Sequence, residues 1–300
     1  MLNCKFSILY FLKHYSQLIK FRLSITVVFS ALFGYLLGSD NPKILELTLL
    51  TIGGLLVTGS ANAFNQIIEK DQDKLMTRTK ERPMPANNLS VSEAIIFASF
   101  TGFLGLYLLF LINLQCSFFA LLSLLIYTLF YTPLKRTSPI AIFIGAFPGA
   151  IPCLLGWVAA TNDFGLAAGV LFAIQFCWQF PHFIAISWLL EDQYKAAGLK
   201  MMIGKSNIKS SSSSFIAIVF SVLMTITSMT PWLFSIENLR LSPLFALIIF
   251  TLGLYFTFIT MQLFIQGEKR NAKKILISSY IYLPLTQVLF ILDKYLNQLL

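Results

Sequence analysis

Three oxygen-bearing side chains recur at every fourth position where a long apolar segment meets a polar one. They are Asn65, Glu69 and Asp73. Residues four apart lie on one face of a helix, so the three would point the same way while Asp71 points elsewhere. Carboxylate and amide oxygens are hard ligands suited to Mg²⁺. We therefore interpret this row as a metal site, with a solvated helix end of mixed charge as the alternative.

Cations follow the acidic row closely. Arg78 and Arg82 lie in the loop after it, and Lys135 and Arg136 end another apolar segment. Mg²⁺ in proteins is usually held by one or two carboxylates together with substrate phosphates. Basic side chains beside such an ion would neutralise phosphate oxygens, so the spacing predicts a site for a metal–diphosphate complex. Lys135 and Arg136 have a second explanation, because cations in such loops also set membrane topology.

Two further groups could do chemistry. His182 follows Pro181 inside an apolar segment, and an intramembrane histidine is a candidate functional residue by default. It could ligate a heme iron, act as a base, or only form a hydrogen bond to a neighbouring helix. Glu191 and Asp192 end the same segment. Asp192 is predicted to supply a second metal contact, with an ordinary surface loop as the alternative.

The elements that must position these side chains are transmembrane helices. The 300-residue chain is 57% hydrophobic and 12% charged, with a mean hydropathy of +0.76, whereas soluble chains are about 45–50% apolar and 25% charged. Apolar runs in lipid must be helical, because a helix satisfies its backbone groups internally. We predict an all-α, polytopic membrane protein with about nine spans, at roughly 23–38, 44–64, 92–112, 117–132, 140–160, 166–190, 215–236, 241–265 and 275–292.

The positive charges orient this bundle. If the N terminus is cytoplasmic, all 22 Lys and Arg residues except Lys43, Arg240 and Lys294 fall on the cytoplasmic side, as the positive-inside rule expects. The C terminus is then outside. Because topology explains the net charge of +9, no nucleic-acid partner is inferred. The two longest loops are cytoplasmic in this arrangement, so the chemistry is expected on that side.

Helix-breaking and low-complexity residues predict where the helices are interrupted. Pro148 and Pro152 should break the fifth apolar helix, and a helix broken at mid-depth often lines a cavity. The five serines at 210–214 predict a flexible linker. Residues 1–20 are predicted to form an amphipathic segment at the membrane interface. The whole chain, 1–300, is interpreted as a single membrane domain.

Five motifs occur in one order along most of the chain. They are NxxxExDxD at Asn65–Asp73, RTxxRP at Arg78–Pro83, YTPLKRTSP at Tyr131–Pro139, FPGAIP at Phe147–Pro152 and WQFPHF at Trp178–Phe183. Together they resemble the protoheme IX farnesyltransferases, or heme O synthases, of the UbiA-type intramembrane prenyltransferases. YTPLKRTSP and WQFPHF in particular separate this group from the quinone-type prenyltransferases.

The resemblance implies a nine-helix UbiA-type bundle with its cavity toward the cytoplasmic loops. It implies transfer of a farnesyl group from farnesyl diphosphate to a vinyl group of heme b, which gives heme O and diphosphate. Mg²⁺ is the implied cofactor, and heme b is a substrate. Asn65, Glu69 and Asp73 match the first aspartate-rich motif. The basic positions of the family correspond to Arg78, Arg82, Lys135 and Arg136, and His182 is our candidate for holding heme.

The family also implies a cellular location and partner proteins. The expected location is the cell inner membrane, with a heme A synthase or a terminal-oxidase assembly as a partner besides the substrates and the bilayer.

The chain departs from the family pattern at two places. An Asp-Tyr pair usually precedes Ala-Gly in the second loop, but here Gln193 precedes the tyrosine and the acid lies at Asp192. The first helix usually opens with Lys-Pro, but here with Lys20-Phe21.

Two other functions fit parts of this pattern. A UbiA-type prenyltransferase could use the same chemistry on a quinone precursor or another aromatic acceptor. A transporter for an anionic metabolite is also compatible with nine short-looped helices and broken segments. The clustered acids lie at one membrane face and no strong inverted repeat is visible, which favours the enzyme.

Overall fold

Every regular element in the described part of the chain is a helix. The computed structural model describes residues 8–203, 211–234, 236 and 239–299. One π-helical stretch, η1 (Ile126–Tyr131), joins α6 to α7. The α-helices are α1 (Ile8–Leu18), α2 (Phe21–Gly38), α3 (Ile44–Ile68), α4 (Lys70–Lys74), α5 (Val91–Phe110), α6 (Leu114–Leu125), α7 (Thr132–Leu134), α8 (Ala141–Thr161), α9 (Leu166–Leu189), α10 (Glu191–Ala196), α11 (Ser212–Leu233), α12 (Pro243–Gln266) and α13 (Lys269–Leu299).

Nine candidate membrane spans are present among the described residues, which confirms the predicted number. The fourth span, Leu114–Leu134, combines α6, η1 and α7. The second span runs on to Ile68, past the predicted end near 64, and the ninth begins at Lys269, ahead of 275. Both extensions contain polar residues. The predicted spans ended at these residues because they were placed by hydropathy, but the helices continue through them.

Polar side chains mark where several helices begin. At the start of α5, Ser90 and Glu93 each accept a hydrogen bond from the backbone N–H of the other, which forms a capping box. At the start of α6, Asn113 accepts from the backbone N–H of Cys116. Such caps satisfy amide groups that have no partner within the helix, so these helices begin at defined residues.

Glycines allow α2 and α8 to pack closely in the centre of the bundle. A Cβ on Gly34 would lie 1.9 Å from the carbonyl oxygen of Cys153, and one on Gly156 would lie 1.7 Å from that of Ala31. Only a residue without a side chain fits at such distances. Close approach at small residues is a common way to associate helices in membranes, where lipid is as apolar as a helix surface.

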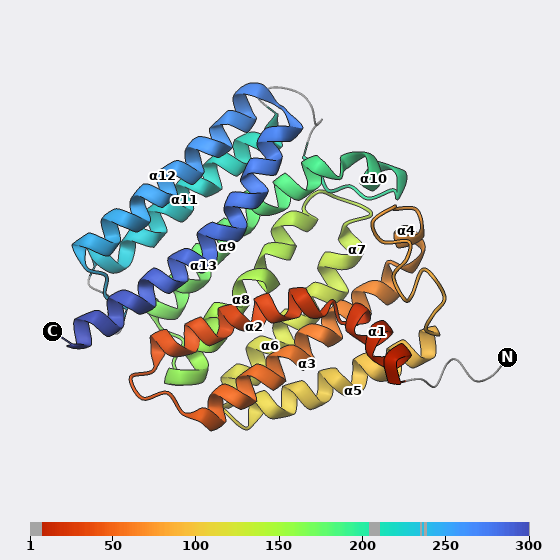
Figure 1. The fold of residues 1–300 in the computed structure, drawn as a ribbon, viewed down its shortest axis with the longest axis horizontal. Helices are drawn as coiled ribbons and strands as arrows, with labels where there is room; N and C mark the ends of the chain where they lie inside the picture. The colour runs from red at the N-terminus through yellow and green to blue at the C-terminus, as the bar shows by residue number, and fades with distance from the viewer. Residues whose placement is uncertain (1–7, 204–210, 235, 237–238, 300) are drawn as a thin grey trace.

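The bundle has two unlike ends and an apolar outer surface. Figure 1 places α4, α7 and α10 together at one end, which we call the loop end, while the C terminus lies at the opposite end. On α5, the large side chains of Ile96, Phe100 and Phe103 are exposed. An exposed apolar belt of this kind suits lipid, so the chain is a multi-pass membrane protein.

The expectation that Pro148 and Pro152 break the fifth helix is wrong. α8 runs unbroken from Ala141 to Thr161 and is largely buried. Pro152 has no N–H, so the carbonyl oxygen of Pro148 loses its helical donor. The hydroxyl of Ser123 donates to that oxygen at 3.4 Å. Neighbouring helices can satisfy freed backbone groups in this way, which is why the helix continues.

The expectation of a flexible linker is also wrong for four of the five serines, and Ser210 lies outside the described residues. Ser211 caps α11 by accepting from the backbone N–H of Ser214. Ser213 is buried, and its hydroxyl donates to the carbonyl oxygen of Ile203 at 2.8 Å. Serine is favoured at helix N-caps, so the same residue type that predicts a linker here begins a helix.

Candidate active site

The predicted acidic row lies at the loop end, buried between helices. α3 ends at Ile68, Glu69 leaves helical geometry with φ −93° and ψ 10°, and α4 begins at the next residue. The continuous helix expected here is therefore interrupted. The side chains of Asn65, Glu69 and Asp73 nevertheless remain together, each no more than 4% exposed. The amide of Asn65 donates to Glu69 Oε2 at 2.9 Å, while Asp71 is exposed, as expected.

Each member of the row has a cationic partner from another segment. Lys135 Nζ lies 2.6 Å from Glu69 Oε1, and Arg82 Nη1 lies 2.9 Å from Asp73 Oδ2. Lys20 Nζ donates to Asn65 Oδ1 at 2.7 Å. A buried charge is tolerated only when it is paired. The site therefore consists of two carboxylates and an amide surrounded by three cations.

The electrostatic environment keeps this site charged. Burial alone would raise the pKa of Glu69, but Lys135 and Lys20 hold it below its ordinary value. Burial would likewise lower the pKa of Lys135, but Glu69 raises it above the ordinary value. Burial, with Arg82 and Lys135 nearby, lowers the pKa of Lys20 to about 7. Of the two lysines of the site, Lys20 therefore holds its proton less tightly.

Lys20 is the site residue that sequence reasoning missed. It precedes α2 in a left-handed conformation, with φ 48°, which is uncommon for a residue other than glycine. This conformation turns the chain between α1 and α2. The sequence did contain a signal for this residue. Lys20 matches the lysine of the Lys-Pro pair with which the first helix of the family usually opens, although Phe21 replaces the proline. Its contact with Asn65, 45 positions along the chain, is visible only in the folded structure.

An aromatic residue supports Lys135 from the π-helical stretch. Lys135 Nζ lies 4.5 Å from the centroid of the Tyr131 ring, a distance at which a cation is attracted to an aromatic face. The ring packs against Gly145 of α8, where an added Cβ would lie 2.5 Å from it. Thr132 accepts a hydrogen bond from the Asn65 amide at 3.2 Å. The predicted motif around Lys135 thus contacts the acidic row through several atoms.

Arg136 and Arg78 occupy different positions at the edge of the site. Arg136 donates to the carbonyl oxygen of Ile68 and, at 2.7 Å, to Gln72, so it secures the end of α3. The Arg78 side chain is exposed and has no ion-pair partner in the described part of the chain. Its backbone N–H donates to Gln193 at 3.4 Å. Arg78 is therefore available to an anionic ligand, whereas Arg136 is already engaged.

Asp192 lies on α10, and its role as a metal contact stays a prediction. Its side chain is 78% exposed and pairs with Lys269 at 3.0 Å. Consecutive residues on a helix point about 100° apart, so the one-residue shift from the family position turns the acid outward. Gln193 faces the first loop instead, where Thr77 donates to its Oε1 at 3.1 Å. A neutral amide thus occupies the position of the family acid.

His182 is buried, and it contacts a neighbouring helix. Its Nδ1 lies 2.8 Å from the hydroxyl of Ser279 on α13, and its ring stacks on Trp178 with centroids 4.6 Å apart. The Nε2 atom has no hydrogen-bond partner among the residues that the structure describes. Of the three roles that the sequence leaves open, the hydrogen bond to a neighbouring helix is present. A role in holding heme stays a prediction.

The oxygens present fit a hard divalent ion, although they do not form a complete cage. No group of three His, Cys, Asp or Glu side chains close enough to hold a metal occurs in the described ranges. Glu69 Oε1 is buried, and Lys135 is the one partner it contacts among the described residues, at 2.6 Å. A carboxylate oxygen with unused capacity beside an amide and a second carboxylate suits Mg²⁺, which takes its remaining ligands from substrate phosphates and water.

Fold and site together define a class of protein. A nine-span helical bundle buries an acidic row among cations at one end, which is the arrangement expected of a membrane enzyme acting on a phosphorylated substrate. Two solved structures share this fold. One, described as digeranylgeranylglyceryl phosphate synthase, has a TM-score of 0.77 at 23% identity and covers 94% of this chain and 98% of its own.

The other is a UbiA homologue from Archaeoglobus fulgidus bound to GPP and Mg²⁺. Its TM-score is 0.66 at 16% identity, and the match covers 92% of this chain and 99% of the homologue. At such identities the two structures establish the fold. The sequence comparison goes further, because the profile of the UbiA prenyltransferase family matches residues 27–282. The chain belongs to the UbiA prenyltransferase family.

A curated relative lies within the same family. The protein named protoheme IX farnesyltransferase from Christiangramia forsetii is 42% identical over 287 residues, which cover 96% of this chain and 95% of the relative. The chain is therefore a membrane prenyltransferase similar to the protoheme IX farnesyltransferases, and the sequence resemblance is confirmed.

Proposed function

We propose that this chain transfers a farnesyl group from farnesyl diphosphate to a vinyl group of heme b, giving heme O and diphosphate. The buried row of Asn65, Glu69 and Asp73 with its three cations carries the donor half of this proposal. Relatives named protoheme IX farnesyltransferase, at 42% identity over nearly the whole chain, support the choice of heme. Heme O serves as a precursor for terminal oxidases in this proposal.

The reaction balances with one water molecule. The bond between farnesyl C1 and the diphosphate oxygen breaks, and the diphosphate keeps the electron pair. C1 then forms a bond to the outer vinyl carbon of heme, which leaves a positive charge on the inner vinyl carbon beside the porphyrin. Water adds to that carbon and releases one proton to solvent. The product carries a hydroxyl group and a farnesyl chain.

The cations of the site stabilise the departing diphosphate. Lys20, Arg82 and Lys135 each contact a protein oxygen. Phosphate oxygens carry more charge than these partners, so the three cations shift toward the leaving group as its negative charge grows. Stabilising developing charge with preorganised groups is commonly the largest catalytic effect in an enzyme. Arg78 adds a fourth cation. Its side chain is exposed and has no ion-pair partner among the described residues, so it can contact the diphosphate without leaving a protein carboxylate.

A divalent ion completes this donor site in the proposal. Glu69, Asp73 and Asn65 would hold Mg²⁺, which supplies Lewis-acid neutralisation of the diphosphate. With these oxygens holding the ion, Lys20, Arg82 and Lys135 would be free to contact the phosphates. The related structure from Archaeoglobus fulgidus bound to GPP and Mg²⁺ supports this assignment.

The acceptor and the setting complete the proposal. His182 is the candidate for holding heme, because its Nε2 has no hydrogen-bond partner in the described part of the chain. The distribution of Lys and Arg supports a cytoplasmic loop end in the cell inner membrane. A heme A synthase or terminal-oxidase assembly would then take up the product from the same membrane.

Expression in a bacterial host that makes only heme b tests this function. Extracted hemes are separated and weighed by mass spectrometry, and heme O is the expected product. Glu69→Gln and Asp73→Asn should each reduce its yield at least about 100-fold. Asp71→Asn is the matched control, because Asp71 is an exposed acid on the same short helix and its variant should retain wild-type yield.

The outcome of this assay separates the alternatives. Unchanged hemes together with a prenylated quinone precursor would assign the acceptor to the aromatic class. Full heme O yield from Glu69→Gln would refute the donor site. Purified protein with farnesyl diphosphate, Mg²⁺ and heme should release diphosphate, and a transporter would not.

A further inference from the structure

The imidazole ring of His182 is fixed by its neighbours on α9 and α13. Its Nδ1 lies 2.8 Å from the hydroxyl of Ser279, and the Trp178 ring stacks on it with an angle of 16° between the two planes. The indole N–H of Trp178 donates to the carbonyl oxygen of Ser279 at 3.1 Å, so the tryptophan is anchored to the same residue. The donor site uses none of these three side chains.

The hydroxyl of Ser279 determines which ring nitrogen carries the proton. That hydroxyl has one hydrogen, and it donates to the carbonyl oxygen of Leu276 at 2.7 Å. Its oxygen can still accept, so the contact with His182 is a hydrogen bond when Nδ1 carries the proton. In the other tautomer the hydroxyl would have to turn away from Leu276 to donate to Nδ1, which leaves one hydrogen bond fewer. The tautomer with two hydrogen bonds is favoured.

The second ring nitrogen, Nε2, then has a lone pair and no proton. Nε2 of His182 forms no hydrogen bond within the described ranges, and it is not one of the fully enclosed polar atoms. A ligand can therefore reach a lone pair that the protein does not use. Neutral imidazole nitrogen is a common ligand of iron and other transition metals. Histidines that bind metals usually donate their other ring N–H to an acceptor, which fixes the ring and its tautomer.

These surroundings suit a metal ligand better than a base. The ring of His182 lies among those of Trp178, Phe183 and Tyr280. No ion pair of His182 occurs in the part of the chain that the structure describes. A base becomes an imidazolium when it takes a proton, and a buried charge without a partner is costly. A bond from Nε2 to iron needs no proton transfer, so the surroundings favour it.

Aromatic rings connect this histidine to the donor site. The centroid of the Phe183 ring lies 5.8 Å from that of His182 and 6.2 Å from that of Tyr131. Lys135 Nζ lies over the Tyr131 ring and pairs with Glu69. Two ring contacts thus lead from the tyrosine of the donor site to the histidine. An acceptor bound at Nε2 would therefore lie near a prenyl group whose diphosphate contacts Lys135.

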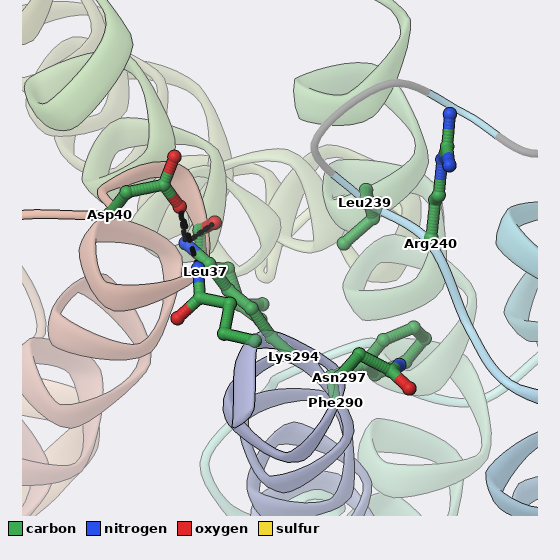
Figure 2. Close-up of a pocket in the computed structure, with 8 residues that line it drawn as sticks. Leu37, Asp40, Leu239, Arg240, Phe290, Lys294 and Asn297 are labelled. Atoms are coloured by element: carbon green, nitrogen blue, oxygen red, sulfur yellow. Dashed lines mark hydrogen bonds and ion pairs between the residues drawn. The ribbon is translucent and has the colours of Figure 1, made fainter. Parts of the chain in front are cut away.

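A pocket elsewhere in the bundle has no comparable ligand. Figure 2 shows this pocket at the C-terminal end, where Lys294 points toward Asp40 while Arg240 projects from the opposite wall. Its volume is about 460 Å³, and the described residues that line it include no His, Cys or Met. Lys294 already donates to the carbonyl oxygen of Ser39 at 2.8 Å. Arg240 can contact an acidic group here, but no lining side chain suits iron.

We propose that Ser279 is the positioning residue that presents His182 Nε2 to the iron of heme b. The inference rests on the proposed function, because heme is the acceptor only there. Ser279 accepts the hydrogen bond from Nδ1 and so keeps the proton away from Nε2, while Trp178 holds the plane of the ring by stacking. Nε2 gives its lone pair to the iron in a coordination bond, and no proton or electron is transferred.

The first test measures the tautomer. The chain contains two histidines, so nitrogen NMR of protein labelled only at histidine gives two rings, and His182→Gln identifies the signals of His182. We expect the wild-type ring to carry its proton on Nδ1. Ser279→Ala removes the acceptor, so a large share of the proton should move to Nε2. A wild-type ring protonated on Nε2 would overturn the proposal.

The second test measures heme binding apart from catalysis. Purified protein is titrated with heme b in detergent, without farnesyl diphosphate, and the Soret band is followed. His182→Ala should lose the spectrum of a histidine-ligated heme, and Ser279→Ala should weaken heme affinity about 10-fold or more. Ser279→Thr keeps a hydroxyl and should retain affinity. In turnover, Ser279→Ala should raise the KM for heme and leave the KM for farnesyl diphosphate unchanged.

Two variants serve as controls. Ser221 is also fully buried, and its hydroxyl donates to the carbonyl oxygen of Ala217 on its own helix at 2.6 Å. Ser221→Ala therefore removes a similar hydroxyl away from any described histidine, and heme affinity should not change. Arg240→Gln removes a cation from the C-terminal pocket and should also leave heme affinity unchanged. A loss of affinity in Arg240→Gln but not in His182→Ala would move heme to that pocket and overturn the proposal.

The outcomes separate this inference from the function on which it depends. If the wild-type chain binds heme and Ser279→Ala binds it with equal affinity and the same spectrum, the role of Ser279 is overturned while the proposed function stands. Absence of heme binding by the wild-type chain would instead refute the proposed function. The wild-type NMR measurement of the His182 tautomer needs no variant at Ser279, so the proposal stays testable if Ser279→Ala does not fold.

Discussion

The contact between α2 and α8 is the packing feature most sensitive to a single methyl group. A Cβ on residue 156 would lie 1.7 Å from the Ala31 carbonyl oxygen, whereas ordinary contact begins at 3.4 Å. Gly156→Ala must therefore move the two helices apart by about 1.7 Å at this point, because a backbone atom cannot rotate away. Overpacking of this kind costs about 1–3 kcal/mol. The melting temperature should fall by several degrees.

A second glycine provides the matched control. Gly169 lies in α9, and an added Cβ there would meet nothing within 4 Å. Alanine is favoured over glycine inside a helix by about 1 kcal/mol, so Gly169→Ala should raise the melting temperature slightly. Thermal unfolding of both variants in the same detergent, followed by circular dichroism, measures the difference. An unchanged or higher melting temperature for Gly156→Ala would refute the packing argument.

Three further predictions concern the donor site. The pKa of Lys20 is about 7, so Lys20 loses its proton and its charge above that pH. The affinity for farnesyl diphosphate, measured by calorimetry, should then weaken by up to about tenfold for each pH unit. Lys20→Arg should abolish that pH dependence, and an unaltered slope would exclude Lys20 as its source. Asp192→Ala should retain wild-type turnover because Asp192 already pairs with Lys269, and a large loss would support its predicted role as a metal contact. A chelator should stop diphosphate release and added Mg²⁺ should restore it, while activity that survives chelation would contradict the metal assignment.

The internal ion pairs of the donor site have a consequence for substrate binding. Glu69 and Asp73 already have cationic partners in the described structure. A diphosphate alone would compete with those carboxylates for the same cations. In the proposed function, Glu69 and Asp73 would hold a divalent ion that arrives with the diphosphate, and Lys135 and Arg82 would then contact the phosphates. On that proposal, the paired site would favour the metal complex over either component alone.

Several features were predictable from the sequence because they depend on neighbouring residues. Apolar length predicted nine spans, since lipid requires continuous helical hydrogen bonding. Four-residue spacing predicted that Asn65, Glu69 and Asp73 share a face, and they remain together although the helix is interrupted at Glu69. The motif order predicted the family, which the comparisons confirm.

Other features depended on contacts between distant segments. The ion pair of Asp192 is one example, because a shift of one residue on a helix turns a side chain by about 100° and the carboxylate pairs with Lys269, 77 positions along the chain. Pro148 and Pro152 break a helix only if no neighbour satisfies the freed carbonyl groups, and Ser123 does so for one of them. Neither partner could be identified from local sequence.

Residue types and their spacing therefore determined which charged groups the loop end contains and which helix face carries them. The tertiary structure decided which cation pairs with which oxygen, and it brought Lys20 to Asn65 across 45 positions. It also aligned Ser30, Gln175 and Gln287 from three helices. Local sequence determines how a segment folds and which face is polar, but only the packing of helices determines which polar faces meet.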